Sequence, residues 1–404
     1  MGVFSTREVS YATESSFAES AGSESGLSFS KRLPALDVRP DFGQERGDDG
    51  SLQVRANHSR PGYLGPRSGS FELDVYWCGH NGACTGALTE TWLQDLLADG
   101  FGGGDVTQVG GTVTAGASAT SIPWSGATLV RGGLVRIGAK GDARADGQFV
   151  VLGTPVTSPA TLLTAAPGVP NNADVIYAAQ IAYPSETLGS SKRFLIASPT
   201  ADAQYIAVGC QLESATLRLA IGELPRWTLK YQVARWVRQT KTVPVVSTLE
   251  DSKCAIWASG SVFYQTVATA TRATEAVNEI ELGIDMGLAA QDGLATGATD
   301  MTVVGYQRLP VKATLTLSKA FATDWDTLFN SDGSDSTYKH LLITGSTTDG
   351  KATAIYAPRA YIAGQRPGAV DYRGIVNTKV SFRCAEGPDE TNELTRSCIR
   401  FASA

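Results

Sequence analysis

The sequence lacks a basic excess, long apolar runs and a signal core, and each absence narrows the classes of protein to consider. The 404 residues carry a net charge of −6, so the chain has no cationic footprint for gripping nucleic acid. No window approaches the roughly 18 apolar residues of a membrane-spanning helix. The first residues contain no apolar signal segment, so we expect synthesis in a cytoplasm and no membrane partner.

Patterns for catalysis and metal binding are also scarce. The chain has three histidines, His58, His80 and His340, and no Gly-x-Ser-x-Gly turn of the hydrolase type. The segment Cys78-Gly-His-Asn-Gly-Ala-Cys84 could begin a zinc site, but no second cysteine and histidine cluster lies nearby to complete it. A glycine turn with two thiols is therefore favoured. We expect no enzymatic activity, no cofactor and no metal.

The six cysteines permit disulfides without demanding them in a chain of this length. Cys78 and Cys84 flank a turn and could pair in an oxidising medium, and a pair of Cys384 with Cys398 is left open. Cys210 and Cys384 fall within predicted strands, where we expect buried thiols.

What the sequence does contain indicates a folded, β-rich chain. Hydrophobic residues make up 42% and charged residues 18%, and the 43 glycines indicate many turns. In the segment 70–77, Phe71, Leu73, Val75 and Trp77 alternate with polar residues, which predicts a strand with one buried face. The segment 88–97 has the apolar spacing of an amphipathic helix packed on a sheet.

A long block of elements is repeated along the chain, which predicts a tandem duplication. Each copy has a strand, a helix, a strand with a turn, a short Gly-x-x-Pro segment and a final strand. The first copy comprises 70–77, 88–97, 207–219, 222–226 and 227–231, and the second comprises 312–317, 322–329, 354–362, 364–368 and 375–382. A chain built from two like units can supply two like edges, which favours a ring-forming structural protein.

The repeat divides the chain into two β domains and an arm. The predicted regions are a first domain at 1–240 with an inserted β subregion at 101–190, a second domain at 241–384 and a C-terminal arm at 385–404. The N-terminal segment 1–38 is predicted to be an arm with one strand near residues 26–33. Its first 24 residues and the C-terminal arm are candidates to become ordered against a neighbouring ring.

The segment 39–69 is polar and rich in Gly, Pro and Arg, and we predict that it is a loop contacting a neighbouring subunit. A solvated loop is the alternative. The loop at 287–300 takes the same place in the second copy. The candidate inter-subunit residues are Arg39, Asp41, Glu45, Arg46, Asp48, Asp49, Arg55 and Arg60.

Several motifs, taken in order, resemble those of the tail tube proteins of long-tailed bacteriophages. They are the opening Tyr11-Ala-Thr-Glu-Ser-Ser-Phe-Ala-Glu, the segment Asp37-Val-Arg-Pro-Asp, the strand Gly69-Ser-Phe-Glu-Leu73, the hairpin from Gly209 to Leu219, and Gly222-Glu-Leu-Pro225. Together they cover most of the chain outside 101–190.

The resemblance implies a mainly β fold with a flanking α-helix; combined with the tandem duplication, in which this chain departs from single-unit members, it predicts two tail-tube-like β-sandwich or β-barrel units, each with such a helix. It implies a virion protein, assembled in the host bacterial cytoplasm, whose rings stack into a channel that genomic DNA crosses without specific binding. The rings would be trimeric and pseudo-hexameric, or hexameric, and the tail contractile or non-contractile. Tape measure, tail terminator and distal tail proteins are the implied partners. The alternative function is a β-rich adhesin or receptor-binding tail or baseplate protein; a hydrolase on a β scaffold is a third.

Overall fold

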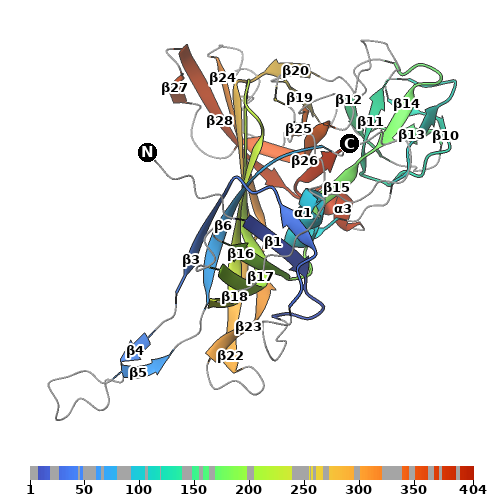
Figure 1. Cartoon of the computed structure of the whole chain (residues 1–404). Coiled ribbons are helices and arrows are strands. Elements are labelled where there is room, and N and C mark those ends of the chain that lie inside the picture. The colour runs from blue at the N-terminus through green and yellow to red at the C-terminus, as the bar shows by residue number, and fades with distance from the viewer. Residues whose placement is uncertain are drawn as a thin grey trace.

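The protein is seen in a computed structural model in which most of the chain is described. The described residues are 8–18, 27–43, 46–48, 61–64, 68–79, 92–104, 108–118, 120–138, 148–153, 158–162, 169–197, 204–238, 254, 256–257, 261–266, 273–294, 301–320, 339–344, 351–362, 368–372, 375–387 and 392–404. The fold is mainly β, as predicted, with long antiparallel strands and two short helices in these ranges (Figure 1).

The first half of the chain forms a seven-stranded antiparallel array in the order β3-β6-β18-β17-β16-β1-β2. The strands are β1 (Glu8–Thr13), β2 (Lys31–Leu33), β3 (Asp37–Phe42), β6 (Gly69–Tyr76), β16 (Lys192–Ala197), β17 (Gln204–Ala220) and β18 (Arg226–Arg238). The alternation predicted for 70–77 is confirmed, since Phe71, Leu73, Val75 and Trp77 are all buried. The period-2 pattern of this strand therefore fixes which face meets the core.

The second half repeats this array as β21-β24-β28-β26-β25-β19-β20. The strands are β19 (Ser261–Thr266), β20 (Ala273–Ala276), β21 (Glu279–Asp285), β24 (Lys312–Ala320), β25 (Lys339–Thr344), β26 (Thr353–Ile362) and β28 (Ile375–Ala385). One further strand, β27 (Gly368–Tyr372), pairs with the first residues of β28. Both halves thus use the same strand order along the chain and across the sheet.

The two arrays also share one irregularity. The ladder between β16 and β17 shifts register between Lys192 and Phe194, and the ladder between β25 and β26 shifts between Lys339 and Leu341. Because ordinary strand pairing does not require a register shift, its recurrence in equivalent ladders aligns the two halves at this point.

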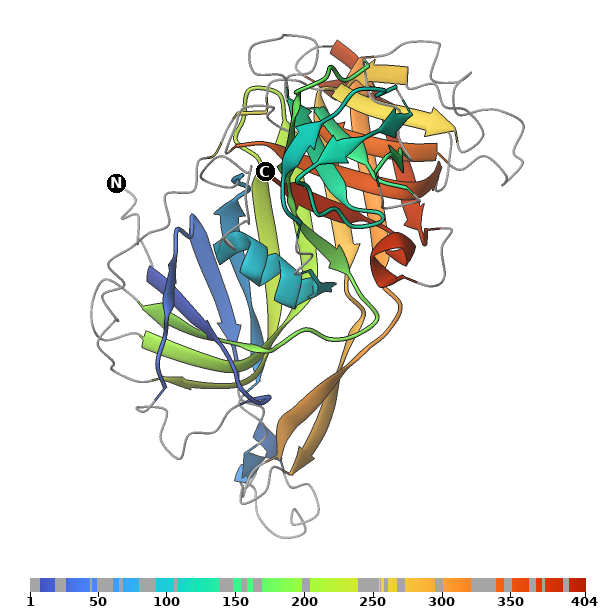
Figure 2. The same cartoon turned by 90° about the vertical axis from the view of Figure 1, so that its right-hand side faces the viewer.

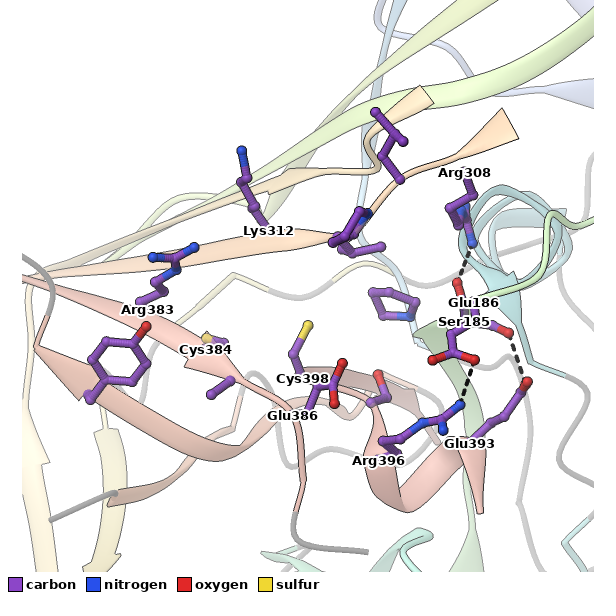
Figure 3. A pocket seen from close by; sticks show the side chains of 17 residues that line it. Ser185, Glu186, Arg308, Lys312, Arg383, Cys384, Glu386, Glu393, Arg396 and Cys398 are labelled. Carbon is purple, nitrogen blue, oxygen red and sulfur yellow. Dashed lines mark hydrogen bonds and ion pairs between the residues drawn. The ribbon is translucent and has the colours of Figure 1, made fainter. Parts of the chain in front are cut away.

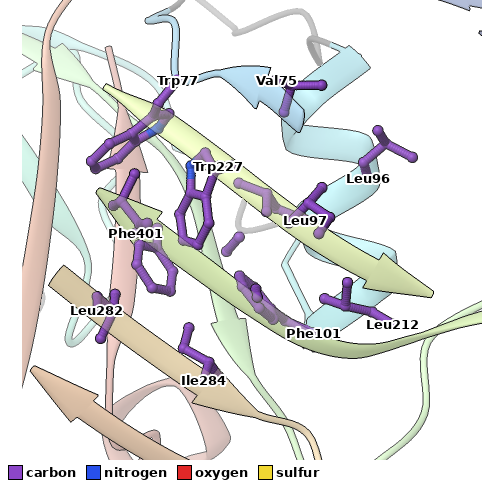
Figure 4. Packing of buried hydrophobic residues seen from close by; sticks show 14 of the residues in the cluster. Val75, Trp77, Leu96, Leu97, Phe101, Leu212, Trp227, Leu282, Ile284 and Phe401 are labelled. Atoms are coloured by element: carbon purple, nitrogen blue, oxygen red, sulfur yellow. The ribbon is translucent and has the colours of Figure 1, made fainter. Parts of the chain in front are cut away.

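The halves are joined edge to edge through β17. Its first part pairs with β16, and its last part, Ser214–Ala220, pairs with β21 of the second half. One core runs beneath this junction: Leu282 and Ile284 of β21 lie in the same buried cluster as Trp227 of β18 (Figure 4). The two halves therefore form one continuous body.

Helix α1 (Trp92–Phe101) covers this core. It presents Leu96, Leu97 and Phe101 to the interior, and the ring centroid of Phe101 lies 6.3 Å from that of Trp227 (Figure 4). The helix runs four residues beyond its predicted end at Leu97. The start of that prediction, 88–91, and the predicted helix at 322–329 lie outside the described residues.

The region between α1 and β16 forms a small β subregion with its own core. Five strands pair in the order β10-β8-β14-β11-β12. They are β8 (Gly111–Val113), β10 (Trp124–Ser125), β11 (Leu134–Gly138), β12 (Gln148–Val151) and β14 (Val175–Ala178), with the short strands β7 (Gly102–Gly103), β9 (Ser121–Ile122), β13 (Ala160–Thr161) and β15 (Gln180–Pro184) around them. Although the subregion is inserted in the first half of the sequence, its residues Leu134 and Ile181 pack with Leu342 and Tyr356 of the second half.

The C-terminal residues 392–404 belong to the folded body, so the prediction that they form an arm was wrong. After helix α3 (Glu393–Arg396), strand β29 (Arg400–Ser403) inserts between β15 and β26. Phe401 is 1% exposed, and its ring centroid lies 5.1 Å from that of Trp227. Hydrophobic side chains at Ile399 and Phe401 therefore close the interior of the first half.

The N-terminal prediction also needs correction. Strand β1 begins at Glu8 and places Val9 and Tyr11 in the core, both with 0% exposure. The segment 1–24 is thus not an arm throughout, because its residues 8–13 pair with β2 and β16.

Two β-hairpins project from the same end of the molecule (Figures 1 and 2). The first joins β4 (Arg46–Asp48) to β5 (Pro61–Leu64) and lies between β3 and β6; the second joins β22 (Leu288–Leu294) to β23 (Met301–Arg308) and lies between β21 and β24. They occupy equivalent places in the two halves, where the sequence predicted loops at 39–69 and 287–300.

A disulfide joins Cys78 to Cys254, which are 176 residues apart in sequence. Because Cys78 is bonded to Cys254, the pairing of Cys78 with Cys84 was wrong; Cys84 itself lies outside the described residues. Cys384 and Cys398 are both free and buried, so the disulfide between them that the sequence left open does not form. Since Cys78 Sγ is bonded to sulfur, it is not a thiolate that could begin a zinc site.

Candidate assembly surface

One end of the first array is strand β3, an edge strand. Among the described strands, β6 alone forms a ladder with it. The Gly43 N–H donates to Ser68 O at 3.3 Å and continues this ladder, so Arg39 and Asp41 direct their backbone groups to β6 while Val38 and Pro40 direct theirs outward. Pro40 has no N–H, and the Val38 N–H donates to Oδ1 of Asp37 at 2.9 Å. The edge is therefore partly shielded against indiscriminate pairing.

A charged cluster fixes β3 on β6 and β18. The side chain of Asp74 is 0% exposed and accepts hydrogen bonds from Arg39 Nη1 at 2.9 Å, from Thr228 Oγ1 at 2.6 Å and from Arg226. Burial alone would raise the pKa of Asp74, but the bonds from Thr228, Arg226 and Arg39 outweigh it and lower the pKa. Asp74 is therefore held as a carboxylate that attracts both arginines.

Arg39 lies in strand β3 and not in the predicted loop, and its side chain is engaged within its own chain. Its guanidinium also contacts Glu72 Oε2 at 2.9 Å and Asp37 Oδ2 at 3.0 Å. Reasoning from sequence missed Asp74 and Arg226 as its partners. The available signal was the alternation of 70–77, which puts Glu72 and Asp74 together on the face of β6 opposite Phe71.

Of the other predicted residues, the structure describes Asp41, Arg46 and Asp48, which lie in two different strands. Asp41 lies in β3 with an exposed side chain, and Arg46 and Asp48 lie in β4, of which only the backbone is described. The remaining residues of the predicted set lie outside the described ranges: Glu45, Asp49, Arg55 and Arg60.

Strand β27 is the corresponding edge at the other end of the chain. Its residues pair with β28 from Gly368↔Lys379 to Tyr372↔Ile375, and β28 is its sole ladder partner among the described strands. In Figure 1, β27 and β28 stand at the end of the long sheet remote from the two projecting hairpins. Strands β3 and β27 are therefore the two ends of the run of paired strands that crosses the junction between the halves, while β2 and β20 end the two arrays on their other sides.

Buried charges hold the first array together beneath α1. Asp95 of α1 accepts hydrogen bonds from Lys192 Nζ at 2.8 Å, Lys31 Nζ at 2.8 Å and the Tyr11 hydroxyl at 2.7 Å. Burial raises the pKa of Asp95, but attraction to Lys192 and these bonds lower it overall. The cluster ties α1 to β1, β2 and β16, so we assign it a structural role.

A pocket of about 570 Å³ lies between the C-terminal segment and strands β23, β24 and β28 (Figure 3). Arg308 crosses its rim and donates to the carbonyl oxygens of Phe101 at 2.6 Å and Ser185 at 2.7 Å. Arg396 pairs with Glu186 at 2.8 Å. These groups fasten neighbouring segments to one another.

The pocket also contains two thiols of low reactivity. Burial raises the pKa of Cys384, and it raises the pKa of Cys398 to about 12, so both stay protonated near neutral pH. A protonated thiol is a poor nucleophile and a poor metal ligand.

The one described histidine, His340, is buried in β25, where its Nδ1 lies 2.9 Å from the Tyr356 hydroxyl. In the described ranges, no three His, Cys, Asp or Glu residues gather as metal ligands would. His58 and His80 lie outside those ranges. Neither of the two described helices has the length and apolar character needed to cross a membrane.

No family model and no curated protein matches this chain. The arguments for its function therefore rest on its motifs and on the geometry described above.

Proposed function

We propose that this protein is a structural subunit that assembles into rings, and that the rings stack into the tail tube of a bacteriophage. The observation that carries the proposal is the repeated strand order, in which the halves join edge to edge and leave β3 and β27 at opposite ends of the pairing. Two unequal edges on one chain make a head-to-tail contact, and such contacts generate closed rings when the rotation allows it.

The two projecting hairpins support stacking. They occupy equivalent places in the halves and leave the body at the same end (Figures 1 and 2), so every ring would carry two hairpins per chain on one rim. A ring of three chains would then have six similar units; a hexamer would have twelve. The net charge of −6 suits a channel that lets DNA pass without binding it. Tape measure, tail terminator and distal tail proteins are the partners that this function requires.

The alternative, a receptor-binding β protein, needs an exposed aromatic surface. Among the described residues, the exposed large hydrophobic side chains are Leu36, Val169, Ile221, Ile256, Val304 and Leu309, none of them aromatic. Trp77, Trp92 and Trp227 are in the core. The described surface therefore favours assembly over glycan recognition.

The test is electron microscopy of the purified protein over a range of concentrations, combined with light scattering. We expect rings and short tubes that form without nucleotide or DNA. A species that stays monomeric at every concentration, or a specific hit on a glycan array with no assembly, would contradict the proposal.

A further inference from the structure

The internal junction between the halves defines a register for the junction between chains. We propose that β27 of one chain pairs antiparallel with β3 of a second copy, with Gly368 opposite Asp41 and Val370 opposite Arg39. This inference rests on the proposed self-assembly and specifies the two edges and the alignment that would build it.

The correspondence begins with two rows of residues that run across the sheet. In the first half, Leu212 pairs with Tyr231, Tyr231 with Phe71, and Phe71 with Pro40. In the second half, Ile362 pairs with Phe382, Phe382 with Leu315, and Leu315 with Leu282. The shared register shift aligns the two rows. At that shift, Lys192 pairs with Cys210 in the first half and Lys339 pairs with Ala360 in the second. Leu212 lies two residues after Cys210, and Ile362 lies two residues after Ala360. The rows make Pro40 of β3 the counterpart of Leu282 of β21.

The same alignment makes β27 the counterpart of the last part of β17. Because Phe382 corresponds to Tyr231, Lys379 corresponds to Thr228. Thr228 pairs with Thr216 of β17, and Lys379 pairs with Gly368 of β27. Gly368 therefore stands where Thr216 stands, and Val370 stands where Arg218 stands.

The first half shows what this position binds. Thr216 pairs with Gly283 and Arg218 pairs with Glu281, both in β21. Since β21 corresponds to β3, the strand that belongs beside β27 is β3, with Asp41 in the place of Gly283 and Arg39 in the place of Glu281. Within one chain β3 is already the far end of the first array, so a second copy supplies it.

The hydrogen-bond directions of β3 agree with this pairing. At the internal junction the Met286 N–H donates to Glu213 O, and the Ile221 N–H donates to Asn278 O, so even-numbered residues of β21 face β17. In β3 the corresponding outward residues are Val38 and Pro40. The backbone hydrogen bond made by the residue just before each strand also matches. Before β3, the Leu36 N–H donates to Asp74 O; before β21, the Asn278 N–H donates to Ser318 O.

Two local features would regulate the contact. The Val38 N–H, now bonded to the Asp37 carboxylate, would exchange that partner for a carbonyl of β27, and Pro40 would contribute its carbonyl alone. The chain–chain ladder is therefore weaker per residue than the internal one. This difference allows a subunit to stay soluble before assembly while its own halves remain joined.

Cysteine cross-linking tests the register. Asp41 and Gly368 would form a pair without mutual hydrogen bonds, whose Cα atoms lie about 4.5 Å apart, a spacing that accepts a disulfide. Chains with Asp41→Cys and chains with Gly368→Cys are purified, mixed, assembled and oxidised. We expect a disulfide-linked dimer when the two variants are mixed. We expect no such dimer when either variant is assembled and oxidised by itself. A chain that carries both Asp41→Cys and Gly368→Cys should give a series of cross-linked oligomers, the largest of which contains as many chains as the ring.

The control mixture pairs Asp41→Cys with Tyr372→Cys, which is four residues out of register and roughly 13 Å away at the rise of a strand. A second in-register pair, Arg39→Cys with Val370→Cys, covers the case in which a substitution at Gly368 prevents folding. Rings seen by microscopy without in-register cross-links, or with equal cross-linking of the control, would overturn the junction and leave the proposed function standing. Absence of both rings and cross-links would overturn both.

Discussion

Arg400 Nη1 donates to the Gly132 carbonyl oxygen at 2.7 Å, joining the C-terminal strand to the inserted subregion across 268 residues of sequence. Its Nη2 donates to Thr395 O at 2.8 Å, and the guanidinium lies over the ring of Tyr356. Burial lowers the pKa of Arg400 to about 10, so the group is still charged at neutral pH. One buried cation thus joins the inserted subregion at Gly132, the C-terminal segment at Thr395 and strand β26 at Tyr356.

Replacing this cation should destabilise the protein strongly. Arg400→Ala leaves two buried carbonyl oxygens without their donor, and we expect a loss of about 3–5 kcal/mol in the free energy of unfolding. Denaturant unfolding followed by tryptophan fluorescence measures it. Arg396→Ala is the matched control, because its partner Glu186 is 69% exposed, and we expect a change within about 1 kcal/mol. Equal effects of the two variants would contradict the assignment.

Asp74 should make the β3 edge sensitive to acid. Its pKa is lowered in the folded protein, so its contribution to stability is present above the ordinary aspartate pKa and is lost as the pH falls through the lowered folded pKa. Asp74→Asn should therefore lower stability at neutral pH and flatten the acid limb of the stability curve. We expect a loss of about 2–4 kcal/mol at pH 7.

The matched control for this prediction is Glu72→Gln, since Glu72 contacts the same arginine from a side chain that is 41% exposed. We expect it to change stability at pH 7 by less than about 1 kcal/mol. Urea unfolding between pH 2 and pH 7 compares the variants. An acid limb in Asp74→Asn identical to that of the parent protein would show that Asp74 is not the titrating group.

The Cys78–Cys254 disulfide should stabilise the protein under oxidising conditions. It joins the end of β6 to the segment that precedes β19, closing a loop with a separation of 176 residues. We expect Cys254→Ser to lower the free energy of unfolding by roughly 2–4 kcal/mol in oxidising buffer. Thermal unfolding with and without reductant is the measurement: the parent Tm should fall on reduction and the Tm of the variant should not. A parent Tm that is insensitive to full reduction would argue against the bond.

The hairpin between β3 and β6 should serve stacking and not folding. Deleting the whole of the predicted loop 39–69 would remove part of β3 and is therefore unsuitable. Replacing 45–65 with a short Gly-Ser link keeps β3 and β6 paired. We expect the parent Tm and intact rings, with loss of tubes in electron micrographs. The matched variant replaces residues 293–302 of the β22–β23 hairpin, which leaves the buried Val303 and Tyr306 in place. Tubes of normal length from both shortened proteins would exclude the hairpins from stacking.

The local pattern of the sequence determined the class of fold and much of its interior. Alternation in 70–77 identified the buried face of β6, and helical spacing identified α1, because both periods are properties of neighbouring residues. The repeated order of predicted elements also indicated two like copies of one block. These are features that a chain encodes within a few turns or strands.

Only the tertiary structure decided which distant segments meet. It paired Cys78 with Cys254, turned Arg39 toward Asp74, placed Phe401 against Trp227 and packed the inserted subregion on the second half. It also aligned β3 with β21 and β27 with the end of β17, which defines the proposed junction. Such contacts depend on strand register and on the closure of long loops, and no local periodicity in the sequence specifies either.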